Sequence, residues 1–155
     1  MLGKGDNDNR WMLDLKKPRE INRPKHVEQI QSYLSQEKVA LGVLFSGDSA
    51  VAYVNPEHSC VVHIWQTITE QELEIMPELD LKKYPIKIAH LSSGSIQEMV
   101  NFFRPLRCTE KFPDIQSITT KLTEDYVKKL RRELKLTTRT EKVQQVLLET
   151  VNNHH

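Results

Sequence analysis

Residues 11–18 read Trp-Met-Leu-Asp-Leu-Lys-Lys-Pro, an apolar run that holds an acid and a base two residues apart. In an extended strand, successive side chains alternate between the two faces. Asp14 and Lys16 would therefore share one face with Met12, while the apolar side chains at positions 11, 13 and 15 would point into a core. The pattern predicts a strand with a carboxylate beside an ammonium group. That face is either a metal site or an ordinary amphipathic surface.

The chain before this strand has the composition of a turn. Residues 1–10 are rich in Gly, Asn and Asp, which tolerate left-handed backbone and bond their own main chain. A turn usually joins two strands. We therefore expect the chain to begin inside a hairpin whose first strand is absent.

The chain after this strand predicts a helix from about residue 24 to residue 36, with Asn22 as a candidate cap. Gln29 and Tyr33 lie one turn apart at the edge of its apolar stripe, so both would face the same neighbour or the solvent. The stripe consists of Val27, Ile30 and Leu34.

The next segment predicts strands. Residues 39–45 form a nearly continuous apolar run, which is typical of a central strand covered on both faces. Residues 46–49 form a turn, and residues 50–54 and 60–65 predict two further strands. One strand, then a helix, then strands is an α/β pattern.

The second half of the chain predicts mainly helices. Residues 69–81 suggest a short helix or loop, and residues 86–91 a strand. Ser92 or Ser95 would cap a helix over residues 96–103 that Pro105 stops. After a loop over residues 106–117, helices starting at Thr123 and Thr140 predict a C-terminal helical hairpin.

Composition sets broad limits on function. The 155 residues, of which 38% are hydrophobic and 28% charged, suit one soluble globular domain. Lys and Arg number 22 against 21 acidic residues, so only a local patch could bind nucleic acid. Cys60 and Cys108 have no paired spacing and no leader is recognisable, which indicates a reducing cytoplasm. The longest apolar runs are far shorter than the roughly twenty residues of a membrane span, so no membrane partner is expected.

Two other constellations have weaker signals. His58, Cys60 and His63 are close in sequence, but on a strand Cys60 and His63 would face opposite ways and no fourth zinc ligand is evident. A basic cluster could contact phosphates, although the interleaved Glu133 favours a solvated helix face. The cluster consists of Lys128, Lys129, Arg131, Arg132 and Lys135.

The order of the motifs carries more information than each motif alone. Asp14-x-Lys16 on a strand precedes a helix with Gln29-x-x-x-Tyr33, an apolar run ending at Gly47, and a further strand. This order resembles the PD-(D/E)XK nuclease superfamily, in particular the nuclease core of type I restriction-enzyme motor subunits and RecB-like nucleases. The resemblance covers about residues 10–55. In that family an acid-x-Lys motif closes a metal site, and the Gln-x-x-x-Tyr helix borders it.

The resemblance implies a fold and a chemistry. The fold would be one nuclease-like domain over residues 1–155, with a restriction-endonuclease-like core over about 10–104, a central mixed sheet flanked by helices, and a helical extension over about 122–152. The activity would be magnesium-dependent hydrolysis of DNA in a restriction or defence system that includes partner subunits, with manganese as a second suitable ion. Asp14 and the Leu15 carbonyl would hold the metal, Lys16 would orient the nucleophile, and Gln29 and Tyr33 would position the reacting groups.

This chain departs from the family at one ligand. The family's other acidic ligand normally lies on the strand before the acid-x-Lys motif. The only upstream carboxylates here are Asp6 and Asp8, in the expected turn, and they could replace it only with irregular backbone. Two hypotheses therefore stand: a nuclease, or a catalytically incomplete nuclease-fold module that binds nucleic acid or a partner protein.

Overall fold

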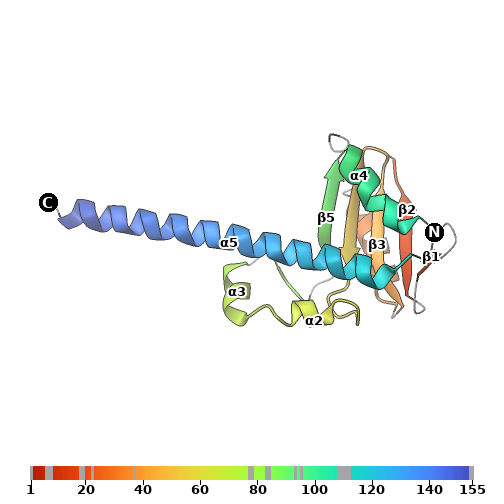
Figure 1. Ribbon diagram of the computed structural model, residues 1–155, viewed down its shortest axis with the longest axis horizontal. Helices are drawn as coiled ribbons and strands as arrows, with labels where there is room; N and C mark the ends of the chain where they lie inside the picture. Colours follow the sequence, from red (N-terminus) through yellow and green to blue (C-terminus); the bar gives the residue numbers. More distant parts are fainter. Residues whose placement is uncertain are drawn as a thin grey trace.

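The fold is built on one mixed sheet of five strands in the order β1-β2-β3-β4-β5 (Figure 1). The computed structural model describes residues 2–5, 9–17, 20–21, 23–36, 38–76, 79–82, 85–92, 94, 96–107 and 113–153. Strands β2 and β3 pair in parallel, and the other neighbours are antiparallel. The strands are β1 (Leu2–Lys4), β2 (Arg10–Leu15), β3 (Val39–Phe45), β4 (Ser49–Val54) and β5 (Ile86–Ser92). The predicted α/β class and the mixed sheet with flanking helices are confirmed.

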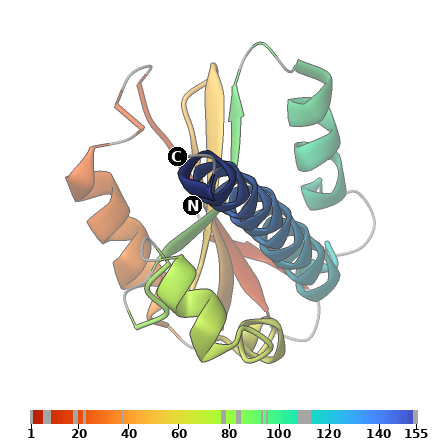
Figure 2. The ribbon, with the colours of Figure 1, turned by 90° about the vertical axis from the view of Figure 1, so that its left-hand side faces the viewer.

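Helices lie on both sides of the sheet. Figure 2 shows α1 on one side, with α4 and the long α5 on the other. The short helices α2 and α3 contribute side chains to the core on the α5 side. The helices are α1 (Pro24–Leu34), α2 (Val62–Trp65), α3 (Glu70–Ile75), α4 (Ile96–Phe103) and α5 (Ile115–Asn153), with a 3-10 helix, η3, over Arg104–Leu106.

Helix α1 lies between β2 and β3, in the predicted order, and most of its stripe is buried. Ile30 and Leu34 are 0% and 1% exposed and pack in one core with Met12 and Leu44. Gly42 of β3 permits the close approach of the helix, because a Cβ atom there would lie 3.2 and 3.3 Å from two carbon atoms of Ile30. The predicted cap Asn22 lies outside the described residues, and Arg23 occupies the cap position.

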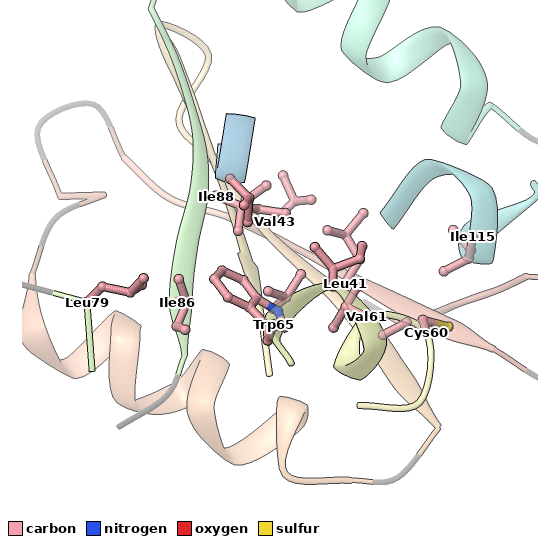
Figure 3. Close-up of a cluster of buried hydrophobic side chains, with 14 of the residues drawn as sticks. Leu41, Val43, Cys60, Val61, Trp65, Leu79, Ile86, Ile88 and Ile115 are labelled. Carbon is pink, nitrogen blue, oxygen red and sulfur yellow. The ribbon is translucent and has the colours of Figure 1, made fainter. Parts of the chain in front are cut away.

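The larger core lies on the opposite face. It joins β3 and β5 to the segment around α2 and to the start of α5, as Figure 3 shows for Leu41, Ile88, Trp65 and Ile115. Trp11 and Leu13 of β2 pack against this core from the sheet. The alternation predicted for β2 is therefore confirmed at these positions, whereas Leu15 is 66% exposed.

The expectation that the first hairpin strand is absent is wrong. Leu2–Lys4 forms β1 and pairs antiparallel with β2, with Leu2 opposite Met12. Gly5, which follows β1, is buried against α5, where an added Cβ atom would meet the Ile115 side chain. Three residues are too short for a periodic signal, so the Gly-rich composition concealed the strand.

The prediction of a strand over residues 60–65 is also wrong. This segment forms a turn and then helix α2, and β5 takes the place beside β4. Four side chains of this segment are buried, and their spacings of one, four and five residues from the first suit a helical face. They are Cys60, Val61, Ile64 and Trp65. A short apolar run does not by itself distinguish a strand from a buried helix.

The predicted C-terminal helical hairpin is replaced by one helix. Helix α5 has 39 residues and continues through the position where Thr140 was expected to start a second helix. No Gly or Pro occurs between Ile115 and Asn153, and threonine has only a modest helix penalty. The helix also starts before Thr123, whose hydroxyl donates to the Thr119 carbonyl instead of capping.

The remaining predicted elements are confirmed with small changes. The mixed segment after residue 69 forms α3, which starts with a capping box between Thr69 and Glu72. Strand β5 and helix α4 occupy the predicted ranges, and η3 contains Pro105. The candidate cap Ser95 lies outside the described residues. Among the described helices, none combines the length and the apolar composition needed to cross a membrane.

Candidate functional site

The polar face of β2 points toward α1. Met12 is buried in the core beneath this helix, and Asp14 pairs in register with Leu44 of the same core. Asp14 lies two residues after Met12 and shares its face. Lys16 lies one residue beyond the end of β2, where its backbone N–H donates to the Phe45 carbonyl at 2.9 Å. This bond fixes the lysine beside the carboxyl end of the parallel pair.

Three predicted site residues are in direct contact. The Lys16 Nζ lies 2.9 Å from the Asp14 Oδ2 and donates to the Gln29 Oε1 at 3.2 Å. The side chains of Lys16 and Asp14 are 14% and 29% exposed, so the pair is partly shielded but accessible from solvent. The predicted convergence of Asp14, Lys16 and Gln29 is confirmed as geometry. We call these three residues the β2–α1 polar cluster.

Tyr33 lies one turn after Gln29 on α1 and is 37% exposed. The helix places it on the same edge as predicted. Within the part of the chain that the structure describes, the contacts of the β2–α1 polar cluster do not include the Tyr33 hydroxyl. The structure therefore joins three of the four predicted side chains, and Tyr33 lies one turn further along α1.

The carboxylate content of the site is low. Strand β1 has the sequence Leu-Gly-Lys and adds no acid beside Asp14. Asp6 and Asp8 lie outside the described residues. Over the described ranges, no group of three or more His, Cys, Asp or Glu side chains is placed to hold a metal ion. Within the described residues, the metal ligands would be the Asp14 carboxylate and the Leu15 carbonyl. Two oxygen ligands are fewer than a hard cation requires, so water would have to supply the others.

The histidine and cysteine pattern serves local structure. The Cys60 backbone N–H donates to the His58 Nδ1 at 3.1 Å, and both residues are buried in the turn before α2. His63 is exposed on α2. Among the residues that the structure describes, these side chains do not form a group that could hold a metal ion.

In the basic cluster on α5, Arg131 forms hydrogen bonds to α3 and to the segment before it. The Arg131 Nε donates to the Glu72 Oε2 at 2.9 Å, and its Nη2 donates to the Thr67 carbonyl at 3.2 Å. The Arg131 hydrogen bond, together with bonds from Thr69, lowers the pKa of the Glu72 carboxyl against the raising effect of burial. This α3–α5 contact was missed from the sequence, because nothing local links residues 72 and 131. The Thr-x-x-Glu capping-box spacing could have located the start of α3.

The fold and the site together define a class of protein. It is an α/β domain with a polar cluster at the carboxyl ends of two adjacent parallel strands, a position where open α/β sheets commonly bind ligands. A scan of the chain against protein-family models and searches among curated proteins and solved structures find no match.

Proposed function

We propose that this chain is a nuclease or nuclease-like component of a restriction or defence system, with a restriction-endonuclease-like fold and DNA as its substrate. The observation that supports the proposal is the contact of Lys16 with both Asp14 and Gln29. These residues come from an acid-x-Lys strand and a Gln-x-x-x-Tyr helix, the order of the PD-(D/E)XK resemblance. A chance surface pair would not require the helix residue to reach the strand motif.

Each residue has a role in this proposal. The Asp14 carboxylate and the Leu15 carbonyl would hold Mg²⁺, or Mn²⁺ in its place. A bound hard cation supplies a water that ionises near neutral pH and offsets charge on the phosphate. The Lys16 ammonium would leave its contact with Asp14 to stabilise the phosphate oxygens. Gln29 and Tyr33 would position substrate and water through hydrogen bonds.

The low carboxylate content favours a second candidate function. One carboxylate and one carbonyl would leave the cation held mostly by water, and Lys16 already neutralises the charge of Asp14. The chain would then be a catalytically incomplete nuclease-fold module that binds nucleic acid or a partner protein, for example another subunit of a defence complex. On this basis we expect slow or no DNA cleavage by the chain alone.

A cleavage assay tests the proposal directly. The wild type, Asp14→Ala and Lys16→Ala are incubated with linear and supercoiled DNA with and without magnesium, and each protein is also melted. Asp125→Ala on α5 and Lys87→Ala on β5 are matched controls, since both side chains are exposed and lie on other elements. Metal-dependent cleavage that both site variants abolish and both controls retain would support the nuclease.

Two outcomes decide against parts of this proposal. Cleavage that neither Asp14→Ala nor Lys16→Ala affects rejects the site. No cleavage, combined with DNA binding that weakens as salt is added, favours the incomplete module, because phosphate contacts release counterions. Calorimetric titration with magnesium or manganese is the independent readout: binding that is equal in wild type and Asp14→Ala removes Asp14 from the metal site.

A further inference from the structure

One buried histidine lies on the side of α1 that faces the sheet. His26 is 6% exposed and continues the stripe of Ile30 and Leu34 at intervals of four residues. Within the described part of the chain, neither its Nδ1 nor its Nε2 has a hydrogen-bond partner. A neutral imidazole has one donor and one acceptor nitrogen, and burying both without partners costs free energy. A bound water or ion is the usual explanation for such a group.

The other buried histidine, His58, has a structural role. Its Nδ1 accepts a hydrogen bond from the Cys60 backbone N–H at 3.1 Å, in the turn before α2. No comparable bond holds the ring of His26 among the described residues. The burial of His26 is therefore not explained by the hydrogen bonding of the described chain.

The contacts of α1 give its direction over the sheet. Ile30 lies against Gly42 of β3, which pairs with Tyr53 of β4. The Leu34 carbonyl accepts from the side-chain amide of Asn55 at 3.3 Å. Because β4 is antiparallel to β3, a residue two positions after Tyr53 lies toward the start of β3. Helix α1 therefore runs opposite to β3, and its first turn lies toward the carboxyl end of that strand.

This direction places His26 at the level of Asp14. His26 lies one turn before Ile30, which moves it about 5.4 Å along the helix axis. Two strand residues span about 6.6 Å, so one turn beyond Gly42 corresponds to Leu44. Leu44 pairs in register with Asp14 of β2.

The ring also lies on the β2 side of α1. Counted from Ile30 at 3.6 residues per turn, His26 and Gln29 fall on one side of the helix and Val27 on the other. Gln29 accepts a hydrogen bond from the Lys16 Nζ, so its side of the helix is the one that faces β2. His26 therefore lies beside the β2–α1 polar cluster, at its buried end.

The cluster has the features of a cation site with an open and a buried end. The Asp14 side chain is 29% exposed, so a cation would enter from solvent and meet the imidazole inside. Lys16 would release Asp14 and keep its second partner, Gln29. The set contains only two side chains of the types His, Cys, Asp and Glu, which accords with the absence of a larger group among the described residues. Neutral imidazole suits transition metals better than magnesium.

We propose that His26 is a ligand of the cation at Asp14, and that the site prefers a divalent first-row transition metal, with Mn²⁺ as the probe, to Mg²⁺. The inference rests on the proposed function, because it adds a ligand to the metal site of that function. A carboxylate, a carbonyl and an imidazole then hold the ion, and water completes the coordination. The third protein ligand compensates for the low carboxylate content of the site.

Calorimetric titration of the full chain with Mn²⁺ and with Mg²⁺ tests the assignment. Loss of a group that only supports a metal ligand already costs about 10–100-fold in affinity, so His26→Gln should weaken Mn²⁺ binding by at least about tenfold. The same variant should leave the weaker Mg²⁺ binding nearly unchanged. His90→Gln is the matched control, since His90 is exposed on β5, and it should bind both ions as the wild type does.

Thermal melts distinguish a ligand from a residue that only packs. His26→Phe keeps an aromatic ring and removes both nitrogens, so without metal it should melt at or above the wild-type temperature. Mn²⁺ should raise the Tm of the wild type, because it binds the folded chain, and should not raise that of His26→Phe. An equal rise in both proteins would show that the ring holds a buried water at most, and would overturn the inference.

Pulsed electron paramagnetic resonance of bound Mn²⁺ reports the ligand directly. At saturating Mn²⁺, the wild type and His90→Gln should show coupling of the metal to an imidazole nitrogen. His26→Gln should lack this coupling. Coupling that persists in His26→Gln would assign the nitrogen to another histidine and reject His26.

Failure of this inference is distinguishable from failure of the proposed function. Mn²⁺ binding that Asp14→Ala abolishes and His26→Gln retains removes His26 and leaves Asp14 in the metal site. A wild type that does not bind Mn²⁺, or that binds Mg²⁺ as tightly, also overturns the inference. The magnesium-dependent cleavage assay with Asp14→Ala and Lys16→Ala then decides on the nuclease by itself.

Discussion

The two faces of the sheet are covered in different ways. One face carries α1, a helix of 11 residues whose stripe is buried against β2, β3 and β4. The other face carries a larger core, to which α4 contributes only half-buried side chains such as Phe102 and Phe103, and α5 extends past the sheet (Figure 1). A helix as short as the sheet has its apolar side covered and only its polar edge available for chemistry. A helix longer than the sheet retains apolar surface that is available for association.

The largest expected effect is loss of packing on the α1 face. Ile30→Ala should lower the free energy of unfolding by about 3 kcal/mol, because it removes a fully buried side chain and leaves a cavity. Val100→Ala, at a position of α4 that is 45% exposed, should change it by less than about 0.5 kcal/mol. Urea denaturation monitored by circular dichroism measures both. Equal losses would mean that α4 is as well buried as α1.

A smaller effect tests the close approach of α1 to the sheet. Gly42→Ala should destabilise by about 1–2 kcal/mol, since the added methyl group would overpack against Ile30. Ile30→Val removes part of the contact, so the double variant should lose less than the sum of the single losses. A double-mutant cycle in urea measures this coupling. Additive losses would show that the two residues do not limit each other.

The β2–α1 polar cluster should contribute less to stability than the core beside it. Asp14→Asn should cost about 1 kcal/mol or less, because the ion pair with Lys16 is partly exposed. Lys16→Met in the Asp14→Asn background should add little, since its partner is already neutral. Thermal melts of the two single variants and the double variant measure the coupling. A loss as large as that of Ile30→Ala would assign the cluster to the core.

The smallest effect concerns the contact between α3 and α5, on the side of the sheet that carries the larger core. Arg131 lowers the pKa of Glu72, so the stabilisation is present above the ordinary value of 4.5 and is lost as pH falls through the lowered value. Glu72→Gln should cost about 0.5 kcal/mol at pH 7 and nothing in stronger acid. Urea melts across pH compare it with Glu74→Gln, which is exposed on the same helix. A difference that persists in acid would show that the carboxylate charge is irrelevant.

The sequence predicted the structure best where the spacing of apolar residues and the order of the elements agree. Alternation along β2 assigned Met12 and Asp14 to one face and Trp11 to the other. The helical spacing of Ile30 and Leu34 assigned the buried side of α1. These two local rules placed the polar edge of the helix beside the polar face of the strand. The contacts of Lys16 were therefore predictable in kind, although their distances were not.

Long-range packing decided the elements that the sequence misassigned. Residues 60–65 became a turn and a helix because the fold buries this apolar segment under α5 and fills the place beside β4 with β5. The segment around Thr140 continues as helix because it contains no Gly or Pro that would break the backbone hydrogen bonds. Threonine disfavours a helix only weakly, so the local preference for a turn at this position is small. Local pattern is ambiguous in both cases.

Residues distant in sequence acquired their roles only from the tertiary structure. The sequence determined an acid-x-Lys strand, a helix with Gln29 at its edge, and the α/β class, because strand and helix periods act over a few residues. The tertiary structure decided that Arg131 reaches Glu72 and that Phe45 and Val100 line one cavity. It also decided that the apolar side chains of residues 142–151 in α5 remain exposed, because a helix is covered only as far as the sheet and its neighbouring elements extend.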